Sequence, residues 1–245
     1  MTRYTYDLHT HSCLSPCAEN DNTPNNLAGM ATLNGIAILA LTDHNTAKNC
    51  PAFFAAAKRY GIVPVPGMEL TTAEDIHIIC LFETLEGAMA FDEAVDNRRV
   101  HIRNRTDIFG EQLILDGEDK VIGTEDDLLP NATGITLEEA PELVRSFGGV
   151  CYPAHIDRPA NGIIETLGTF PQTPFFPCAE FHDAAREAEY RARYDLGARK
   201  TVVSSDAHRL TDLREENASV LLADEPYSSA LVRKRLIEWL RGENG

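Results

Sequence analysis

Long apolar runs and targeting segments are what this sequence lacks. Its longest apolar run, residues 36–41, has the length of a buried strand and falls far short of the roughly 18 residues that a membrane-spanning helix needs. The first residues contain no apolar stretch typical of signal peptides, and the chain has no internal repeat or low-complexity segment. We therefore expect a cytoplasmic protein without a membrane partner.

Basic residues are also scarce. The 22 Lys and Arg residues stand against 38 Asp and Glu residues, which gives a net charge of −16 at pH 7. Such a surface repels polyanions at long range. We therefore expect no long nucleic acid as a partner, although a small anion could still enter a pocket that bound metal ions make locally positive. The sequence does not indicate an oligomeric state.

The composition is otherwise that of an ordinary globular protein, and short apolar runs alternate with helix-like segments. Residues 4–8, 36–41 and 150–154 have strand length, and segments such as residues 47–60, which Gly61 follows, have helical length. This alternation implies mostly parallel strands joined by right-handed crossovers. A closed barrel and an open doubly wound sheet both fit this α/β pattern.

One segment, residues 102–133, breaks the alternation. Residues 112–115 and 120–122 flank a loop that contains Gly117, and this arrangement is typical of a β-hairpin. We interpret the segment as a small insertion in a single domain that spans residues 1–245.

Residues of the kind that bind metals follow or lie in several predicted strands. His9 and His11 end the first strand, and residues two apart on an extended chain point to the same side, so both can reach one ion. The other such residues are His44, Glu69, His77, His155, Asp206 and His208. Because the carboxyl ends of parallel strands meet on one face, we expect these side chains to converge.

Eight converging polar groups would be costly to bury without a partner, which favours a metal centre. Imidazole and carboxylate ligands together suit Zn, Mn or Fe better than Mg or Ca alone. The sequence therefore predicts two or three divalent cations but does not choose among the three metals.

At these positions the sequence resembles the PHP (polymerase and histidinol phosphatase) family. The matching segments, in the family's order, are DLHTHS (7–12), TDH (42–44), PGMEL (66–70), HIIC (77–80), PAHIDR (153–158) and SSDAH (204–208). The resemblance implies a distorted (β/α)7 barrel and the activity of a metal-dependent phosphatase or phosphoesterase.

The resemblance also implies how the ligands are shared among the ions. The first ion would be held by His9, His11, Glu69 and Asp206. Glu69 would bridge to a second ion that also takes His77 and His155, and the third ion would take His44 and His208.

The third site departs from the family pattern. Many members carry Ser-Asp-Gly after the two histidines, and that Asp completes the site. Counting back from residues 23–24, Glu19 takes its place after an apparent insertion of three residues. Asp21 and Cys17 are rival ligands, and a third site that is weak or empty is a further alternative.

Other polar residues near these motifs have predicted roles. Arg158 lies three residues past His155, and its guanidinium suits a substrate phosphate. We assign Asp43 to the catalytic site as a residue that orients a metal-bound histidine rather than as a base. A group of arginines at the start of the insertion forms either a lid over a second anionic group or a solvated helix face: Arg98, Arg99, Arg103 and Arg105.

The expected chemistry follows from the metals. Paired cations lower the pKa of a bridging water, and the resulting hydroxide attacks phosphorus while cationic groups neutralise the phosphoryl oxygens. We therefore predict a phosphatase or phosphoesterase that hydrolyses a small phosphorylated metabolite or nucleotide. The alternatives are a metal-dependent hydrolase of C–N or C–O bonds and a non-catalytic metal-binding regulatory module.

Overall fold

A computed structural model describes residues 1–215 and 217–243 of the chain. Its strands are β1 Thr2–Asp7, β2 Ile38–Leu41, β3 Val63–Thr71, β4 His77–Phe82, β5 Leu113–Leu115, β6 Val121–Thr124, β7 Gly149–Pro153, β8 Cys178–Phe181, β9 Lys200–Val203 and β10 Ser219–Leu222. Its α-helices are α1 Pro24–Leu33, α2 Cys50–Tyr60, α3 Leu85–Asp96, α4 Thr106–Phe109, α5 Ala140–Ser146, α6 Ile163–Leu167, α7 Glu187–Arg193 and α8 Ser229–Arg241.

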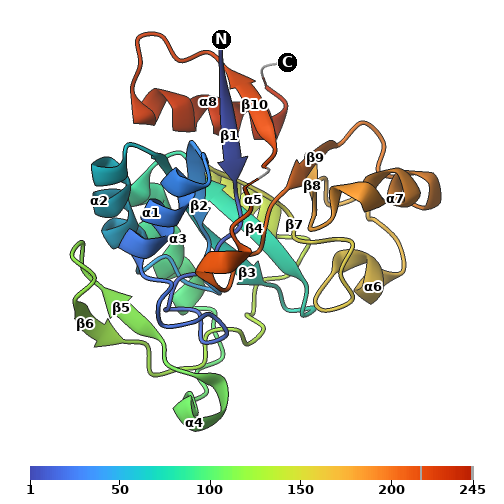
Figure 1. Cartoon of the computed structure of the whole chain (residues 1–245). Coiled ribbons are helices and arrows are strands. Elements are labelled where there is room, and N and C mark those ends of the chain that lie inside the picture. Colours follow the sequence, from blue (N-terminus) through green and yellow to red (C-terminus); the bar gives the residue numbers. More distant parts are fainter. Residues whose placement is uncertain (216, 244–245) are drawn as a thin grey trace.

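Within the described residues, a curled sheet of six strands in the order β10-β1-β2-β3-β4-β7 forms the centre of the molecule (Figure 1). Strands β1, β2 and β3 are parallel, whereas β4 runs antiparallel to both β3 and β7. Strands β8 and β9 form a separate parallel pair. An isolated bridge between Thr10 and Ala207 connects the chain after β9 to the end of β1.

The fold is therefore a mixed α/β structure with a curled sheet, and a closed (β/α)7 barrel is not confirmed. The expectation of mostly parallel strands fails at β4. Residues 72–76, which join β3 to β4, are too few for a helical crossover, so β4 returns antiparallel. As a result, the beginning of β4 lies at the same end of the sheet as the end of β3.

Two apolar cores hold this arrangement together. Helices α1, α2, α3 and α5 pack on the outer face of the sheet, where Leu39 and Leu41 point toward them. Ile38 and Ala40 alternate with these residues and point into the curl, where they join a second core that includes α8. Helix α8 covers the end of the curl at which β1 begins, so the opposite end carries the polar residues (Figure 1).

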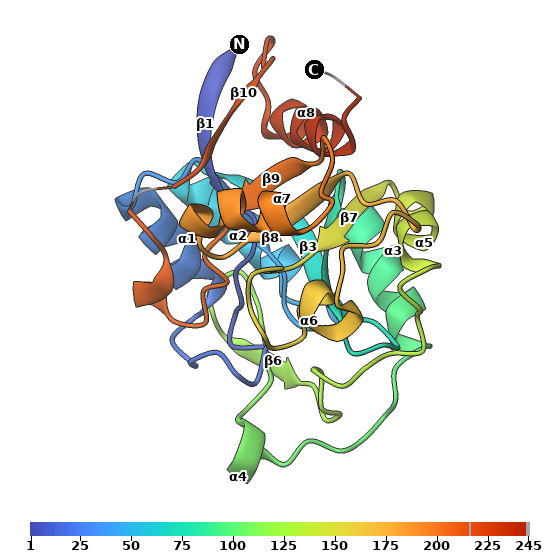
Figure 2. The same ribbon diagram turned by 90° about the vertical axis from the view of Figure 1, so that its right-hand side faces the viewer.

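The predicted hairpin is present in the inserted segment. Strands β5 and β6 pair antiparallel and project with α4 away from the sheet, as Figure 2 shows for α4. The backbone N–H of Leu113 donates to the Cys13 carbonyl, so the hairpin packs on the loop that follows β1. The interpretation of residues 1–245 as a single domain with an insertion stays a prediction. No helix among the described residues is long and apolar enough to cross a membrane.

Candidate metal centre

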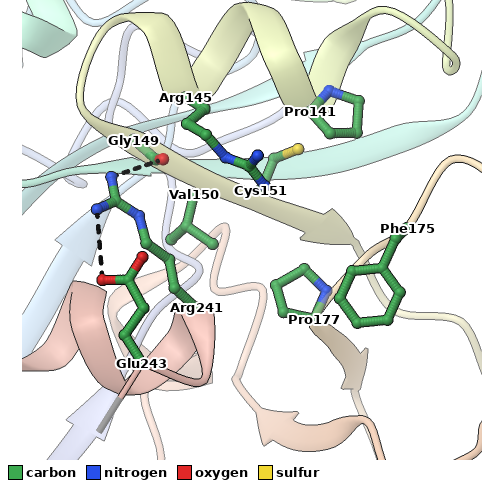
Figure 3. Close-up of a pocket in the computed structure, with 9 residues that line it drawn as sticks. All are labelled: Pro141, Arg145, Gly149, Val150, Cys151, Phe175, Pro177, Arg241 and Glu243. Carbon is green, nitrogen blue, oxygen red and sulfur yellow. Dashed lines mark hydrogen bonds and ion pairs between the residues drawn. The ribbon is translucent and has the colours of Figure 1, made fainter.

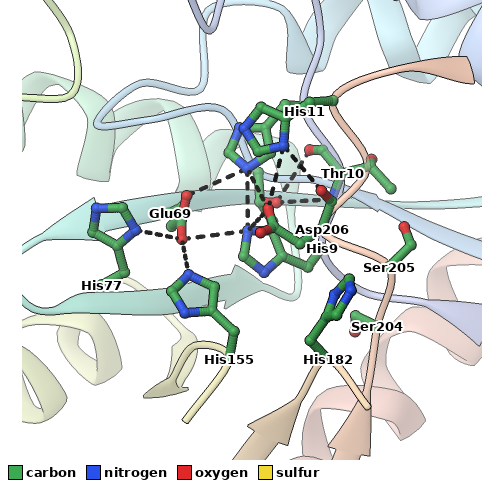
Figure 4. Close-up of polar contacts among 12 residues, drawn as sticks. His9, Thr10, His11, Glu69, His77, His155, His182, Ser204, Ser205 and Asp206 are labelled. Atoms are coloured by element: carbon green, nitrogen blue, oxygen red, sulfur yellow. Dashed lines mark hydrogen bonds and ion pairs between the residues drawn. The ribbon is translucent and has the colours of Figure 1, made fainter. Parts of the chain in front are cut away.

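All eight predicted core ligands meet at the open end of the curled sheet (Figure 4 labels six of them). His9 and His11 follow β1, His44 follows β2, and Glu69 lies within β3. His77 begins β4, and His155 follows the end of β7. Asp206 and His208 lie in the loop after β9. Side chains separated by up to 199 positions in the sequence numbering (9 to 208) are thus neighbours in space.

The first group of ligand atoms matches the set implied for the first ion. The Nε2 atoms of His9 and His11 lie 3.1 Å apart, and both face Asp206 Oδ1, at 3.1 and 3.3 Å. The Glu69 carboxylate completes the group, at 3.4 Å from His9 and 3.3 Å from His11. All four side chains are buried, and their ligand atoms lie within 4.8 Å of one another.

Glu69 occupies the middle of the centre. Its Oε1 atom lies 2.8 Å from His77 Nδ1 and 3.2 Å from His155 Nε2, while its Oε2 atom lies 2.9 Å from His44 Nδ1. A carboxylate that faces histidines with both oxygens can bridge two cations. This geometry fits the bridging role implied for Glu69, which stays a prediction.

A third group consists of His11, His44 and His208, which stack closely, with ring centroids of His11 and His208 4.2 Å apart. The structure does not bring Glu19 to this group. Its side chain is exposed and forms an ion pair with Arg209, although its backbone N–H donates to the His208 carbonyl. Among the described residues, the clusters that could hold an ion include neither Asp21 nor Cys17.

Orphaned polar atoms indicate that these residues fit a bound cation. Glu69 Oε2 and Asp206 Oδ1 are buried and have no hydrogen-bond partner in the part of the chain that the structure describes. Both oxygens nevertheless lie within 3.4 Å of histidine nitrogens, so the contacts are close without being aligned as hydrogen bonds. Atoms that point at a shared centre rather than at each other are what a metal site requires.

Two of the ligands adopt unusual backbone conformations. His155 has a φ of 26° and Asp206 a φ of 53°, in the region that residues with a Cβ rarely occupy. Such conformations cost about 1–3 kcal/mol each and persist where the surrounding structure holds them in place. Their presence at two ligand positions therefore points to a functional constraint on these two loops.

The buried charges divide the histidines into two classes. Burial alone lowers the pKa of His9 and of His11, but nearby carboxylates, above all Asp206, outweigh it and raise the pKa of His11 to about 9. Burial lowers the pKa of His44 to about 3 and that of His208 to about 4. Without metal, the first pair therefore holds protons at neutral pH, while the second pair is neutral and ready to ligate.

Glu180 is a residue of the centre whose role the sequence does not reveal. It is buried in β8, its Oε1 lies 2.8 Å from His9 Nδ1, and the same oxygen accepts from the His155 backbone N–H at 3.1 Å. A carboxylate that holds Nδ1–H of a histidine fixes the ring so that Nε2 faces the metal. The sequence feature that could have revealed this role is a glutamate within the otherwise apolar strand Cys178–Phe181.

Asp43 does not contact the His44 ring that follows it. Its oxygens accept hydrogen bonds from the backbone and hydroxyl of Ser12 and from Ser15 Oγ, all at 2.7 Å. Ser15 Oγ in turn lies 2.9 Å from His11 Nδ1. The geometry therefore fits an orienting role that acts on His11 through Ser15, whereas direct participation in catalysis stays a prediction.

Arg158 lies at the rim of the centre. Its guanidinium forms an ion pair with Asp206 Oδ2, and its side chain is 40% exposed. Asp206 thus turns Oδ1 toward the histidines and Oδ2 toward Arg158. The arginines of the insertion behave differently, because Arg98 and Arg105 pair with acidic neighbours. A substrate-binding role for Arg158 stays a prediction.

A separate crevice of about 80 Å³ lies beside α5 and β7 (Figure 3). It is lined by Pro141, Arg145, Gly149, Val150, Cys151, Phe175, Pro177, Arg241 and Glu243. Arg241 already donates to the Gly149 carbonyl at 3.0 Å and faces Glu243 at 4.0 Å. The crevice contains none of the clustered histidines, so it lies apart from the candidate metal centre.

Comparison with known proteins assigns part of the chain to a protein family. Residues 7–125 match the family model of the PHP domain. Over these residues, the chain belongs to the PHP family. The matched stretch contains five of the eight clustered ligands, and the resemblance noted in the sequence is thereby confirmed. The other three ligands, His155, Asp206 and His208, lie beyond the matched residues and reach the centre through the fold.

Known proteins similar to this chain act on different substrates. A 5′-3′ exoribonuclease of Haemophilus influenzae is 37% identical over 79 residues, which are 31% of this chain and 28% of that enzyme. The lesion-specific endonuclease PfuEndoQ of Pyrococcus furiosus shares the fold over 100% of this chain and 57% of its own, with a TM-score of 0.64 and 16% identity. This chain thus spans only part of the length of both proteins.

A third similar protein comes from Bifidobacterium adolescentis and is described as a metal-dependent phosphoesterase. It matches 83% of this chain and 87% of its own length, with a TM-score of 0.54 and 17% identity. Such low identities establish a shared fold and leave the substrate open.

The expected exclusion of long nucleic acid is wrong. Endonuclease Q, solved with a 27-mer duplex that carries an abasic lesion at the active site, aligns over 100% of this chain and 58% of its own, with a TM-score of 0.62 and 15% identity. The physical reason is that a net charge of −16 describes the whole surface. Cations bound at the cluster would, together with the nearby arginines, set the potential at the mouth of the centre.

Proposed function

We propose that this PHP chain is a metal-dependent phosphoesterase that acts on nucleotide or nucleic-acid phosphate esters. The observation that carries the proposal is the convergence of His, Asp and Glu ligand atoms around Glu69. Divalent cations bound there would supply an activated water and neutralise phosphoryl oxygens. The exoribonuclease and endonuclease relatives support a nucleotide-containing substrate.

The protein's own groups prepare the site for this chemistry. Glu180 accepts from His9 Nδ1–H and keeps His9 Nε2 directed at the cluster. The low pKa values of His44 and His208, which burial causes, leave their nitrogen lone pairs free at neutral pH. Arg158 at the rim provides a guanidinium for a phosphoryl oxygen. We further propose that the centre binds two or three ions of Zn, Mn or Fe.

The test compares His9→Ala with His101→Ala. His101 is exposed and pairs with Asp127 on the inserted segment, so its loss removes an imidazole without touching the centre. Metal content and phosphate release should be measured on nitrophenyl phosphate monoesters and diesters, nucleotides and short oligonucleotides. We expect His9→Ala to lose on the order of 100-fold or more in kcat/KM and part of its metal, and His101→Ala to retain both.

Two outcomes would overturn the proposal. Wild-type protein that retains two or more ions but releases no phosphate from any ester would indicate a non-catalytic module. Turnover of amides or lactones without turnover of phosphate esters would indicate a hydrolase of C–N or C–O bonds.

A further inference from the structure

A second cleft, which contains two arginines, adjoins the metal centre. It has a volume of about 280 Å³ and is lined by Arg158, His182, Ser205, Asp206, Asp212 and Arg214. The cleft over the metal ligands, about 140 Å³ in volume, shares Arg158 and Asp206 with it. Figure 4 shows His182 on the side of the centre where Ser205 and Asp206 lie. Asp206 is therefore the wall between the two clefts.

Two guanidinium groups flank one imidazole in this second cleft. The Nη2 atoms of Arg158 and Arg214 each lie 3.5 Å from His182 Nε2, so they are no more than 7 Å apart. Arg214 Nη2 also donates to the His182 carbonyl at 2.8 Å, which fixes its position. Like charges held this close repel one another unless an anion lies between them.

Among the described residues, the carboxylates around the cleft form no ion pair with Arg214. Asp206 pairs with Arg158, and Asp212 accepts hydrogen bonds from the backbone N–H groups of His208 and Arg209. Within residues 1–215 and 217–243, no carboxylate forms an ion pair with Arg214. Burial, and after it the neighbouring arginines, lower the pKa of the partly buried His182, so the positive charge beside this imidazole comes from the two guanidinium groups.

The cleft continues away from the metal centre. A third hollow, of about 570 Å³, shares His182 and Arg214 with the second and extends along Asp183, Val203 and Asn217. The three hollows thus adjoin one another along a path over the surface, from the metal ligands past Arg158 and then past Arg214. A substrate that follows this path would place one phosphate at the metals and the next at the paired guanidinium groups.

We propose that Arg214, together with Arg158 and His182, forms a binding subsite for a second phosphate of the substrate, next to the phosphate that is hydrolysed. This proposal rests on the proposed function and narrows its substrate class to compounds with two phosphates one short spacer apart, as in a nucleotide strand. Guanidinium groups suit this role because their forked donors match phosphate oxygens.

The test uses dinucleotides that differ by one phosphate. Thymidylyl-thymidine has a single phosphodiester, and its 5′- and 3′-phosphorylated forms add a second phosphate on either side. Wild-type protein should prefer one phosphorylated form by about tenfold or more in kcat/KM. Arg214→Gln keeps a donor for the His182 carbonyl but removes the charge. It should lose this preference, because its kcat/KM for the phosphorylated dinucleotide should fall by about tenfold more than its kcat/KM for the unphosphorylated one.

Two further variants complete the comparison. Arg214→Lys should retain part of the preference, because it keeps the charge without the fork. Arg3→Ala removes one arginine charge from an exposed position that contacts Ser219, and it should behave as wild type. Metal content and melting temperature confirm that each variant is folded. A propanediol bisphosphate compared with its monophosphate tests the second phosphate without any nucleoside. A higher kcat/KM for the bisphosphate would support the subsite.

The subsite is wrong if Arg214→Gln weakens all dinucleotides equally or leaves the preference intact. Failure of the proposed function is a different result, because the wild-type protein would then hydrolyse none of these esters. In that case, calorimetric binding of the phosphorylated and unphosphorylated dinucleotides to wild type and Arg214→Gln still decides the question. Equal affinities of the wild type for both would refute the subsite.

Discussion

Glu180 offers the sharpest test of how the fold prepares the metal centre. One of its buried oxygens holds two ligands at once, the His9 ring through Nδ1 at 2.8 Å and the His155 backbone at 3.1 Å. Substitution Glu180→Gln keeps the shape and one acceptor oxygen but removes the charge. Hydrogen bonds to charged groups contribute about 1.5–3 kcal/mol, and each 1.4 kcal/mol is a factor of ten in affinity.

We therefore expect Glu180→Gln to bind its first ion about 10–100-fold more weakly, which agrees with the usual effect of losing a residue that orients a metal ligand. Affinity should be measured by competition with a chromogenic chelator, and turnover at saturating metal. Asp224→Asn is the matched control, since Asp224 is a buried carboxylate that accepts from the Tyr4 hydroxyl at 2.7 Å, toward the opposite end of β1.

The pH dependence gives this prediction a specific signature. The Glu180 charge is one of the carboxylates that raise the pKa of His9 against the effect of burial. Removing it makes His9 easier to deprotonate, which partly offsets the weaker orientation when the pH is low. The loss of affinity should therefore grow as the pH rises. A variant that binds metal within about threefold of wild type at every pH would refute the reasoning.

Two further predictions concern His11. Burial lowers its pKa, but the close carboxylates of Asp206 and Glu69 raise it to about 9, from an ordinary value of 6.5. The metal-free protein should therefore lose stability as the pH rises from about 6.5 to 9, while metal affinity increases over the same range. Thermal melts with and without chelator measure both trends. A metal-free protein whose stability rises together with metal affinity would contradict the assignment. Ser15→Ala removes the link from Asp43 to His11 Nδ1 and should cost about 1–3 kcal/mol of unfolding free energy, measured by urea denaturation of the metal-free protein, with Ser146→Ala on the exposed end of α5 as a control that should change little.

Much of the centre was predictable from sequence because its ligands obey local rules. His9 and His11 lie two apart on an extended segment, and His44 and His155 follow strands, so their convergence follows from strand direction. His77 reaches the same place for a different reason. It begins β4, and the short connection after β3 turns β4 around, so that its first residue rather than its last lies at the open end.

Other parts of the site depend on contacts that no local pattern encodes. Glu180 is recognised only once β8 is known to lie beside the end of β7. Arg214 lies in an irregular segment and meets His182 across 32 positions of the chain. Glu19 is a residue that counting along the sequence placed in the site and that the structure places outside it. Its exposed side chain pairs with Arg209 instead of reaching the third group of histidines. A three-residue insertion changes where a loop points, and alignment by count cannot detect this.

The central position of Glu69 explains why this centre should couple metal binding to protons. Although burial raises the pKa of this carboxylate, the surrounding histidines, His77 first, hold it well below its usual range. The negative charge is therefore present whether or not a metal is bound, and something positive must accompany it in a buried site. Protons on His9 and His11 supply that charge in the metal-free protein. Cations can enter only as those protons leave, so the same carboxylates that hold the metal-free protein's histidines together also set the pH at which metal binds.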